Sequence, residues 1–310
     1  MRLAAVTGAT GFLGRQLVAA LAAEGWAVRA LVRRDAVLAA PAGLEPEIVI
    51  GGLSDAEAMD RLCRDAEVLV HAAGLIKARR PADFLSANVE GARRAAQAAQ
   101  RGGVGRMVLV SSLAAREPKL SDYAASKRAG EGVAAEILGE RLTIVRPPAI
   151  YGPGDVETLA VFEAARRLPF APVFDPRARI AMIHVQDAAR QIAVAASRAP
   201  ERPLVALSDA RPDGYGWSEI AAAAANAVGR SPSLVRLPSA ALDLAGFLGA
   251  LQRMGGRNPI LSPGKAREMR HLDWSLHPEE RWGGAPEAEF NLGDGFAQTV
   301  ASWRVAGRLL

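Results

Sequence analysis

Two side chains that could move a proton stand four residues apart in the segment YAASK, namely Tyr123 and Lys127. On a helix, residues at this spacing project from the same face. A tyrosine near its reference pKa of about 10 is a poor base at neutral pH, and an adjacent ammonium favours the phenolate and lowers that pKa. The pair is therefore predicted to exchange a proton with a substrate hydroxyl or carbonyl. Lys127 is also one of only four lysines among 38 lysines and arginines, which fits a site that needs a compact ammonium.

Two serines precede this pair at the end of an apolar run. Ser111 and Ser112 follow RMVLV, and ten residues separate Ser112 from Tyr123. If the run is a strand of a parallel sheet, a serine hydroxyl and the phenol could converge above the carboxyl edge of that sheet, where ligands of such sheets bind.

A glycine-rich segment near the start of the chain is of the type that binds phosphate. TGATGFLG, residues 7–14, places Gly8, Gly11 and Gly14 between an apolar run and a helical pattern. Without a Cβ the backbone can turn tightly and lie against a pyrophosphate, whose charge meets the free amides at the helix N-terminus. The segment is predicted to hold the phosphates of a dinucleotide. The residues between the glycines that are expected to contact it are Thr10, Phe12 and Leu13.

The end of the second apolar run, at residues 27–32, indicates which adenosine ribose the dinucleotide has. An acidic residue at the end of this strand would bind a ribose 2′-hydroxyl, and an arginine would accommodate a 2′-phosphate. The chain has ALVRR at residues 30–34, with no carboxylate and with guanidinium groups at Arg33 and Arg34. NADP is therefore favoured, and NAD stays the alternative.

The elements that must position these residues alternate along the first half of the chain. Six short apolar runs read as strands, at residues 3–6, 27–32, 47–50, 67–72, 106–111 and 142–146. Helical patterns lie between them, at residues 14–25, 55–66, 88–103 and 122–139. The alternation predicts an α/β fold, a Rossmann-type doubly wound parallel sheet with helices on both faces.

A smaller, mostly helical substrate domain is expected after residue 150. Residues 180–209 read as one more helix and strand that return to the first sheet, so the predicted domains are discontinuous. The dinucleotide-binding domain is placed at 1–150 and about 176–208, and the substrate-binding domain at about 151–175 and 209–310. Within the latter, Ser218 is predicted to cap a helix.

Composition excludes several classes of protein. The net charge of +5 comes from dispersed arginines without a long basic run, so no nucleic-acid partner is expected. One cysteine, Cys63, and four scattered histidines provide neither a disulfide nor metal-ligand spacing. No apolar stretch of 18 residues or more and no signal-peptide pattern are visible, so the chain is expected to be cytoplasmic, without membrane insertion.

The motifs taken together resemble the extended branch of the short-chain dehydrogenase/reductase superfamily, which comprises NAD(P)-dependent epimerases, dehydratases and reductases. The segments that carry the resemblance are TGATGFLG, HAAG at 71–74, Asn88 in NVEGARRAAQAA, the double serine, YAASK, RPPAIYGPGD and IHVQDAA. The similarity covers essentially the whole chain, including a C-terminal segment, FNLGDGFAQTVASWRVAGRLL, that is similar to the closing helix of that branch.

The resemblance implies roles for the matching residues. Ser112 is the expected catalytic serine, Tyr123 the catalytic tyrosine, and Lys127 a lysine that also binds the nicotinamide ribose. Tyr123 is counted among the cofactor contacts as well. It also suggests a homodimer paired through the fourth and fifth helices. The further residues that it implies beside the cofactor are Ala72, Ala73, Gly74, Ser111, Pro147, Ala149 and Ile150.

Two departures from the family pattern bear on function. Gly52 stands where relatives often have an aspartate near adenine, although Leu53 can still pack there, and both are kept as expected cofactor contacts. After the serines, LAAREP lacks the Tyr-Gly that sugar-nucleotide epimerases commonly carry. This weakens the nucleotide-sugar interpretation.

Three functions are compatible with the sequence. The favoured one is an NADP-dependent oxidoreductase that moves a hydride between the cofactor and a carbonyl or secondary alcohol of a small molecule. The second is a sugar-nucleotide epimerase or dehydratase that retains its cofactor. The third, a non-catalytic NADPH-binding sensor or scaffold, would be indicated by a broken serine, tyrosine and lysine set, and here that set is intact.

Overall fold

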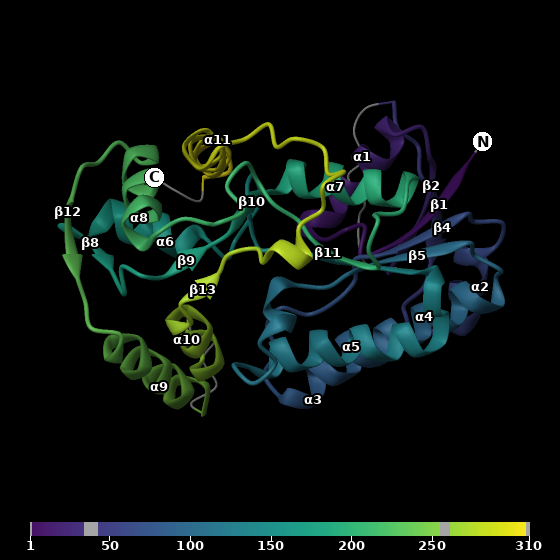
Figure 1. Cartoon of the computed structure of the whole chain (residues 1–310), viewed down its shortest axis with the longest axis horizontal. Coiled ribbons are helices and arrows are strands. Elements are labelled where there is room, and N and C mark those ends of the chain that lie inside the picture. Colours follow the sequence, from purple (N-terminus) through teal and green to yellow (C-terminus); the bar gives the residue numbers. More distant parts are fainter. Residues whose placement is uncertain (1, 34–42, 255–260, 308–310) are drawn as a thin grey trace. The chain divides into compact units, whose positions relative to one another are not determined.

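The computed structural model describes residues 2–33, 43–254 and 261–307 (Figure 1). By their internal contacts these residues form two units. Unit 1 comprises Met1–Pro147, Ala188–Leu207 and Glu280–Pro286, and unit 2 comprises Pro148–Asp187, Ser208–Glu279 and Glu287–Leu310.

The boundaries of the units differ from the expected domains. Residues 148–150, 176–187 and 208 group with unit 2, whereas 280–286 group with unit 1. The segment 280–286 joins unit 1 because Glu280 pairs with Arg146 and because Arg281 forms a bridge to Ala206. The assignment of cofactor binding to the first unit and substrate binding to the second stays a prediction.

Unit 1 is built on a parallel sheet of seven strands. Its strands are β1 (Leu3–Thr7), β2 (Ala27–Val32), β3 (Glu47–Ile50), β4 (Val68–His71), β5 (Arg106–Val110), β6 (Leu142–Arg146) and β11 (Leu204–Ala206). They lie in the order β11-β6-β5-β4-β1-β2-β3. The chain proceeds outward in one direction from β1 and in the other from β4, so the order reverses between these two strands, where ligands of open parallel sheets bind. The predicted Rossmann-type sheet is confirmed.

Helices cover both faces of this sheet. They are α1 (Phe12–Ala23), α2 (Ala56–Cys63), α3 (Pro81–Phe84), the π-helix η1 (Leu85–Glu90), α4 (Gly91–Arg101), the 3-10 turns η2 (Leu113–Arg116) and η3 (Gly139–Arg141), α5 (Asp122–Leu138) and α7 (Val185–Ser197). Figure 1 shows α2, α4 and α5 on one face of the sheet and α1 and α7 on the other. The core on the first face is rich in alanine and leucine, which brings α4 close to the strands.

Unit 2 combines helices with short parallel strand pairs. Its pairs are β7 (Ala149–Tyr151) with β10 (Met182–His184), β8 (Phe170–Val173) with β12 (Ser233–Arg236), and β9 (Arg179–Ile180) with β13 (Asp273–Trp274). Its helices are α6 (Leu159–Arg167), α8 (Trp217–Ala227), α9 (Ala240–Met254), α10 (Pro263–Arg270) and α11 (Leu292–Val305), and the 3-10 turn η4 (Pro278–Glu280) lies at the boundary. Edge-to-face aromatic rings, among them Tyr151, Phe162, Phe296 and Trp303, fill its core.

One expected helix cap of unit 2 is wrong. Helix α8 begins at Trp217 with Gly216 as its cap residue, so Ser218 lies inside the first turn. The amide of Gly216 donates to the carboxylate of Glu219 at 2.8 Å, which is the half of a capping box that satisfies the amide of the cap residue.

Candidate active site

The three glycines of the first loop serve different purposes. Gly8 has a φ of +78°, and a Cβ placed on it would lie 2.6 Å from the amide nitrogen of Ala73. A Cβ on Gly14 would lie 2.0 Å from the carbonyl oxygen of Gly8. Gly11 is exposed with an ordinary backbone, and a Cβ there would meet only the Gly8 carbonyl, at 3.2 Å. The chain's own packing thus requires Gly8 and Gly14. Gly11 is the one of the three that this packing does not require, which is compatible with its predicted contact with a phosphate.

The start of helix α1 fits an anionic group. Its cap residue is Gly11, which makes no side-chain capping bond, and its first turn contains no acidic residue. The amides of the first helical turn have no intrahelical acceptors and carry the positive end of the helix dipole. These amides and the exposed backbone of Gly11 fit the pyrophosphate of a dinucleotide. Of the predicted contacts, Phe12 and Leu13 lie in this first turn, and Thr10 directly precedes the cap residue.

The segment that follows β4 lies against the glycine loop. The amide of Ala72 donates to the carbonyl oxygen of Thr7 at 3.1 Å, and the amide of Ala73 lies 3.4 Å from the Thr7 hydroxyl. Because β1 and β4 are neighbours in the sheet, these contacts bring two segments that are far apart in the sequence to the point where the strand order reverses. Gly74 is exposed, and a Cβ on it would lie 3.8 Å from Nζ of Lys127.

His71 at the end of β4 has a structural role. Its Nδ1 lies 2.7 Å from the Thr7 hydroxyl, and the side chain is buried. Burial, with a smaller contribution from the charge of Lys127, lowers the pKa of His71 to about 3. His71 is therefore neutral at physiological pH and is not a candidate proton carrier.

Helix α5 carries the predicted catalytic pair. Ser121 caps this helix by accepting a hydrogen bond from the amide of Ala124 at 3.0 Å, so Tyr123 falls in its first turn and Lys127 one turn later. Both side chains are half-buried. The Tyr123 ring lies 6.1 Å from the ring of Phe84 between centroids. The pair thus occupies one helical face, as its spacing predicts.

Lys127 is anchored at the end of strand β5. Its Nζ donates a hydrogen bond to the carbonyl oxygen of Val110 at 2.8 Å. Burial lowers the pKa of Lys127 to about 8, and the nearby carboxylate of Glu131 opposes that shift. The ammonium and the neutral amine are therefore close in free energy near physiological pH.

The two serines after β5 point to different partners. Ser111 is buried, and its hydroxyl donates to Oε1 of Glu131 at 2.5 Å. Ser112 is partly exposed, and its hydroxyl accepts a bond from the amide of Ala114 at 3.2 Å. Of the two hydroxyls, that of Ser112 is accessible to a substrate oxygen, whereas that of Ser111 is engaged inside the protein.

A buried ionic network that the sequence analysis missed lies behind the lysine. Glu131, one helical turn after Lys127, accepts two hydrogen bonds from Arg146, at 2.8 and 2.7 Å. Arg146 also pairs with Glu280 at 3.0 Å, and Glu280 pairs with Arg116 at 2.9 Å. Two signals in the sequence could have revealed it: a charged residue closing the apolar run LTIVR, and a glutamate four residues after the lysine.

Asn88 connects the loop after β4 to helix α5. It lies in the π-helix η1, an element that often occurs at functional sites. Its side chain accepts a hydrogen bond from the amide of Leu75 at 2.8 Å and donates to the Leu75 carbonyl at 3.0 Å and to the Ser126 hydroxyl at 2.9 Å. The Ser126 hydroxyl donates to the carbonyl of Tyr123 at 2.8 Å. Asn88 therefore fixes the loop relative to the turn that carries the phenol.

The predicted adenosine contacts lie near the ends of β2 and β3. Arg33 follows β2 and is exposed, whereas Arg34 lies outside the described residues. Gly52 has open space around its α-carbon, and Leu53 packs against the core of unit 1. Nothing in this geometry conflicts with their predicted role.

The predicted nicotinamide contacts belong to different units. The carbonyl of Pro147 accepts a bond from the amide of Leu113 at 2.8 Å, which ties it to the turn that Ser112 opens. Ala149 and Ile150 lie on β7 of unit 2 and are exposed and half-buried, respectively. The two units are described separately, so the role of these last two residues stays a prediction.

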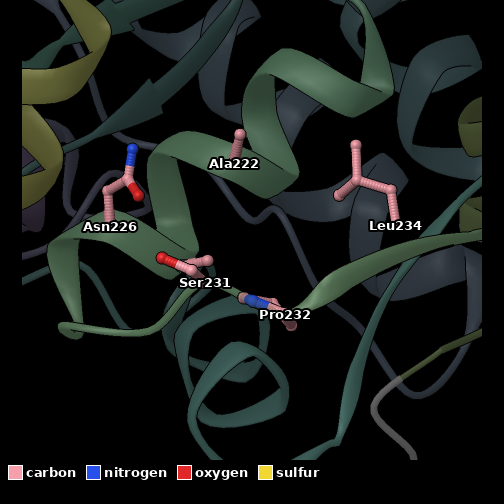
Figure 2. Close-up of a pocket in the computed structure, with 6 residues that line it drawn as sticks. Ala222, Asn226, Ser231, Pro232 and Leu234 are labelled. Atoms are coloured by element: carbon pink, nitrogen blue, oxygen red, sulfur yellow. The ribbon is translucent and has the colours of Figure 1, made fainter.

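A small cavity in unit 2 does not compete as an active site. It has a volume of about 180 Å³ and lies between α8 and β12 (Figure 2). Its lining residues are Ala222, Ala225, Asn226, Ser231, Pro232 and Leu234. The volume is below the roughly 300–1,000 Å³ of small-molecule sites, and the lining contains no titratable group. The cavity therefore offers no alternative to the predicted site in unit 1.

The glycine loop, the sheet and the Tyr123–Lys127 pair define an NAD(P)-dependent enzyme of the short-chain dehydrogenase/reductase type. The model of the NAD dependent epimerase/dehydratase family matches residues 4–205, and the chain belongs to this family. The predicted superfamily, the enzymatic character and the nicotinamide cofactor are thereby confirmed. Neither the preference for NADP nor the substrate follows from the family.

Two relatives and one solved structure show what the chain is similar to. It is 51% identical over 306 residues, covering 98% of this chain and 95% of the relative, to the ceramide reductase of Caulobacter vibrioides (strain NA1000 / CB15N). It is 33% identical over 227 residues, covering 67% of this chain and 68% of the relative, to the 4-hydroxy-2-methyl-3-oxo-4-farnesyl-3,4-dihydroquinoline-1-oxide ketoreductase of Stigmatella aurantiaca. The crystal structure of gox2253 superimposes with a TM-score of 0.78 at 23% identity, covering 100% of this chain and 99% of that one, which supports the fold.

Within the described ranges, no helix is long and apolar enough to cross a membrane. Among the same residues, no group of three or more histidine, cysteine, aspartate or glutamate side chains is arranged to hold a metal ion.

Proposed function

We propose that the chain is an NADPH-dependent reductase that converts a ketone of a ceramide-type lipid into the corresponding secondary alcohol. The observation that carries this proposal is the 51% identity to a ceramide reductase along 98% of the chain. The identity extends over both units, so it includes residues outside the cofactor motifs. A second relative acts on a farnesylated ring system, which is again an apolar substrate.

The residues of unit 1 suit this reaction. When bound, the reduced cofactor would supply a hydride to the carbonyl carbon. The phenol of Tyr123 donates the proton that the carbonyl oxygen acquires, and the accessible hydroxyl of Ser112 donates a hydrogen bond to that oxygen. The ammonium of Lys127, one helical turn away, would favour the phenolate that the proton transfer leaves behind.

The choice of NADPH rests on the end of β2. Arg33 is exposed there, and a guanidinium matches a phosphate in bidentate geometry. The segment ALVRR offers no carboxylate for a 2′-hydroxyl. A 2′-phosphate is therefore the expected ligand.

The test is NADPH oxidation with a ceramide whose secondary hydroxyl is replaced by a ketone, followed by mass spectrometry of the product. Turnover and a mass gain of two hydrogens are expected. Tyr123→Phe is expected to lose about 10²- to 10⁴-fold in turnover, the usual contribution of a general acid, and to keep the wild-type affinity for NADPH. Turnover of a nucleotide sugar with retained cofactor, and none of the keto-lipid, would establish the epimerase alternative. Loss of NADPH affinity with unchanged turnover would contradict the role of Tyr123.

A further inference from the structure

Three large apolar side chains beside the catalytic turn are exposed. The exposed fraction is 40% for Leu75, 59% for Ile76 and 54% for Leu85. None of them belongs to the two hydrophobic clusters given for the described residues, one in each unit, or packs against these clusters as a partly buried member. Exposed apolar residues that gather next to functional groups often mark a binding surface.

The segments that carry these side chains are joined by named contacts to the helix that carries Tyr123. Leu75 is fixed through its amide and its carbonyl by the side chain of Asn88, which also bonds to Ser126 on α5. Leu85 directly follows Phe84, whose ring lies 6.1 Å from the ring of Tyr123. The loop after β4 and the start of η1 are thus tied to the first two turns of α5, and Figure 1 shows α3 alongside α5.

The loop that carries Leu75 and Ile76 begins beside the catalytic lysine. A Cβ added to Gly74, the residue before Leu75, would lie 3.8 Å from Nζ of Lys127. Between Ile76 and Leu85 the sequence carries charged residues, namely Lys77 and the ion pair of Arg80 with Asp83, at 2.7 Å. The exposed apolar side chains therefore flank a charged segment along the chain.

We propose that Leu75, Ile76 and Leu85 form a binding surface for a hydrocarbon chain of the substrate, next to the catalytic tyrosine. This inference rests on the proposed function, because an apolar chain attached close to the reacting ketone is what a ceramide-type lipid contains. Burial of methylene groups against these side chains would favour long-chain over short-chain substrates. The backbone of Leu75 is held by hydrogen bonds to the side chain of Asn88. The Leu75 side chain is not needed to hold the loop in place and can contact a ligand.

The experiment compares Ile76→Ser and Leu85→Ser with the wild type on keto-ceramides whose chains are shortened stepwise, all presented in the same detergent micelles. Each variant is expected to lose about tenfold in kcat/KM with the longest chains and to equal the wild type with the shortest. NADPH affinity and the midpoint of thermal unfolding are expected to stay unchanged, because neither residue belongs to a core cluster. The matched control is Ile48→Ser on β3, which alters a side chain that is 43% exposed and remote in sequence.

The outcomes separate this inference from the proposed function. If the wild type reduces long-chain keto-ceramides and the variants do so equally well, the binding surface is refuted and the proposed function stands. A loss that is equal at every chain length would indicate displacement of Tyr123 and would also refute it. A loss that occurs only with substrate in lipid vesicles would assign the surface to a membrane instead. If the wild type reduces none of these lipids, the proposed function fails.

Discussion

Gly11 is exposed and has little protein around its α-carbon, and this leads to a specific prediction about cofactor binding. In Gly11→Ala the new methyl group would meet only the Gly8 carbonyl oxygen, at 3.2 Å, on a backbone with φ of −74° and ψ of 173° that alanine readily adopts. The fold should tolerate the change. The methyl group would, however, stand where the pyrophosphate is proposed to approach the backbone, so cofactor affinity should fall at least about tenfold, which corresponds to about 1.4 kcal/mol.

The same substitution at Gly14 should act on stability instead. A methyl group there would lie 2.0 Å from the Gly8 carbonyl oxygen, so the loop and helix α1 would have to separate by roughly 1 Å or more to restore a normal contact. Overpacking of this kind costs about 1–3 kcal/mol. As a control, Gly132→Ala in the middle of α5 meets no atom within 4 Å and should stabilise the protein by about 0.5–1 kcal/mol.

The assays are NADPH fluorescence titration and urea unfolding without cofactor, on all three variants. Gly11→Ala should change the titration and leave the unfolding curve within about 0.5 kcal/mol of the wild type. Gly14→Ala should shift the unfolding midpoint. Wild-type NADPH affinity in a folded Gly11→Ala protein would refute the proposed phosphate site, and an unchanged unfolding curve for Gly14→Ala would refute the packing argument.

Three further predictions concern charged residues. Because burial lowers the pKa of Lys127 to about 8, the rate of ketone reduction should fall as the pH rises through about 8, where the lysine becomes a neutral amine that no longer assists the phenol. A rate that stays constant between about pH 7 and 9 would contradict the role of the lysine charge. Glu131→Gln removes the carboxylate that raises the pKa of Lys127, so the fall in reduction rate should move to lower pH. The free energy of unfolding should decrease by about 3 kcal/mol because Arg146 loses a buried partner. The exposed control Glu136→Gln should change neither the pH profile nor the free energy of unfolding. Arg33→Ala should weaken NADPH binding about tenfold, or about 1.4 kcal/mol, and leave NADH binding unchanged, and an equal effect on both cofactors would refute the role of Arg33.

Local patterns in the sequence predicted the sheet, and the placement of Tyr123 and Lys127 on one helix, accurately. All six expected strands occur, with boundaries within a residue or two, because buried parallel strands are short apolar runs that glycine and charged residues interrupt. The return of β11 to the edge of β6 was also predicted. The Tyr123–Lys127 pair lies on one face of α5 because its spacing is that of a helical turn.

Contacts between distant segments were not predictable in the same way. Both serines after β5 have the same local pattern, yet Ser111 binds the buried Glu131 and Ser112 stays accessible, because alternate residues at a strand end point to opposite sides. The grouping of 280–286 with unit 1 likewise depends on pairing with Arg146, which lies 134 residues earlier in the chain.

The sequence by itself determined the class of this protein: the glycine spacing, the alternation of strands and helices, and the tyrosine and lysine one turn apart are all local features with a direct physical meaning. Only the tertiary structure decided which of the three glycines is not needed for the chain's own packing, which serine is accessible, and that Leu75, Ile76 and Leu85 are exposed. The reason is that accessibility depends on which other segments pack against a residue, and those segments lie far away along the chain.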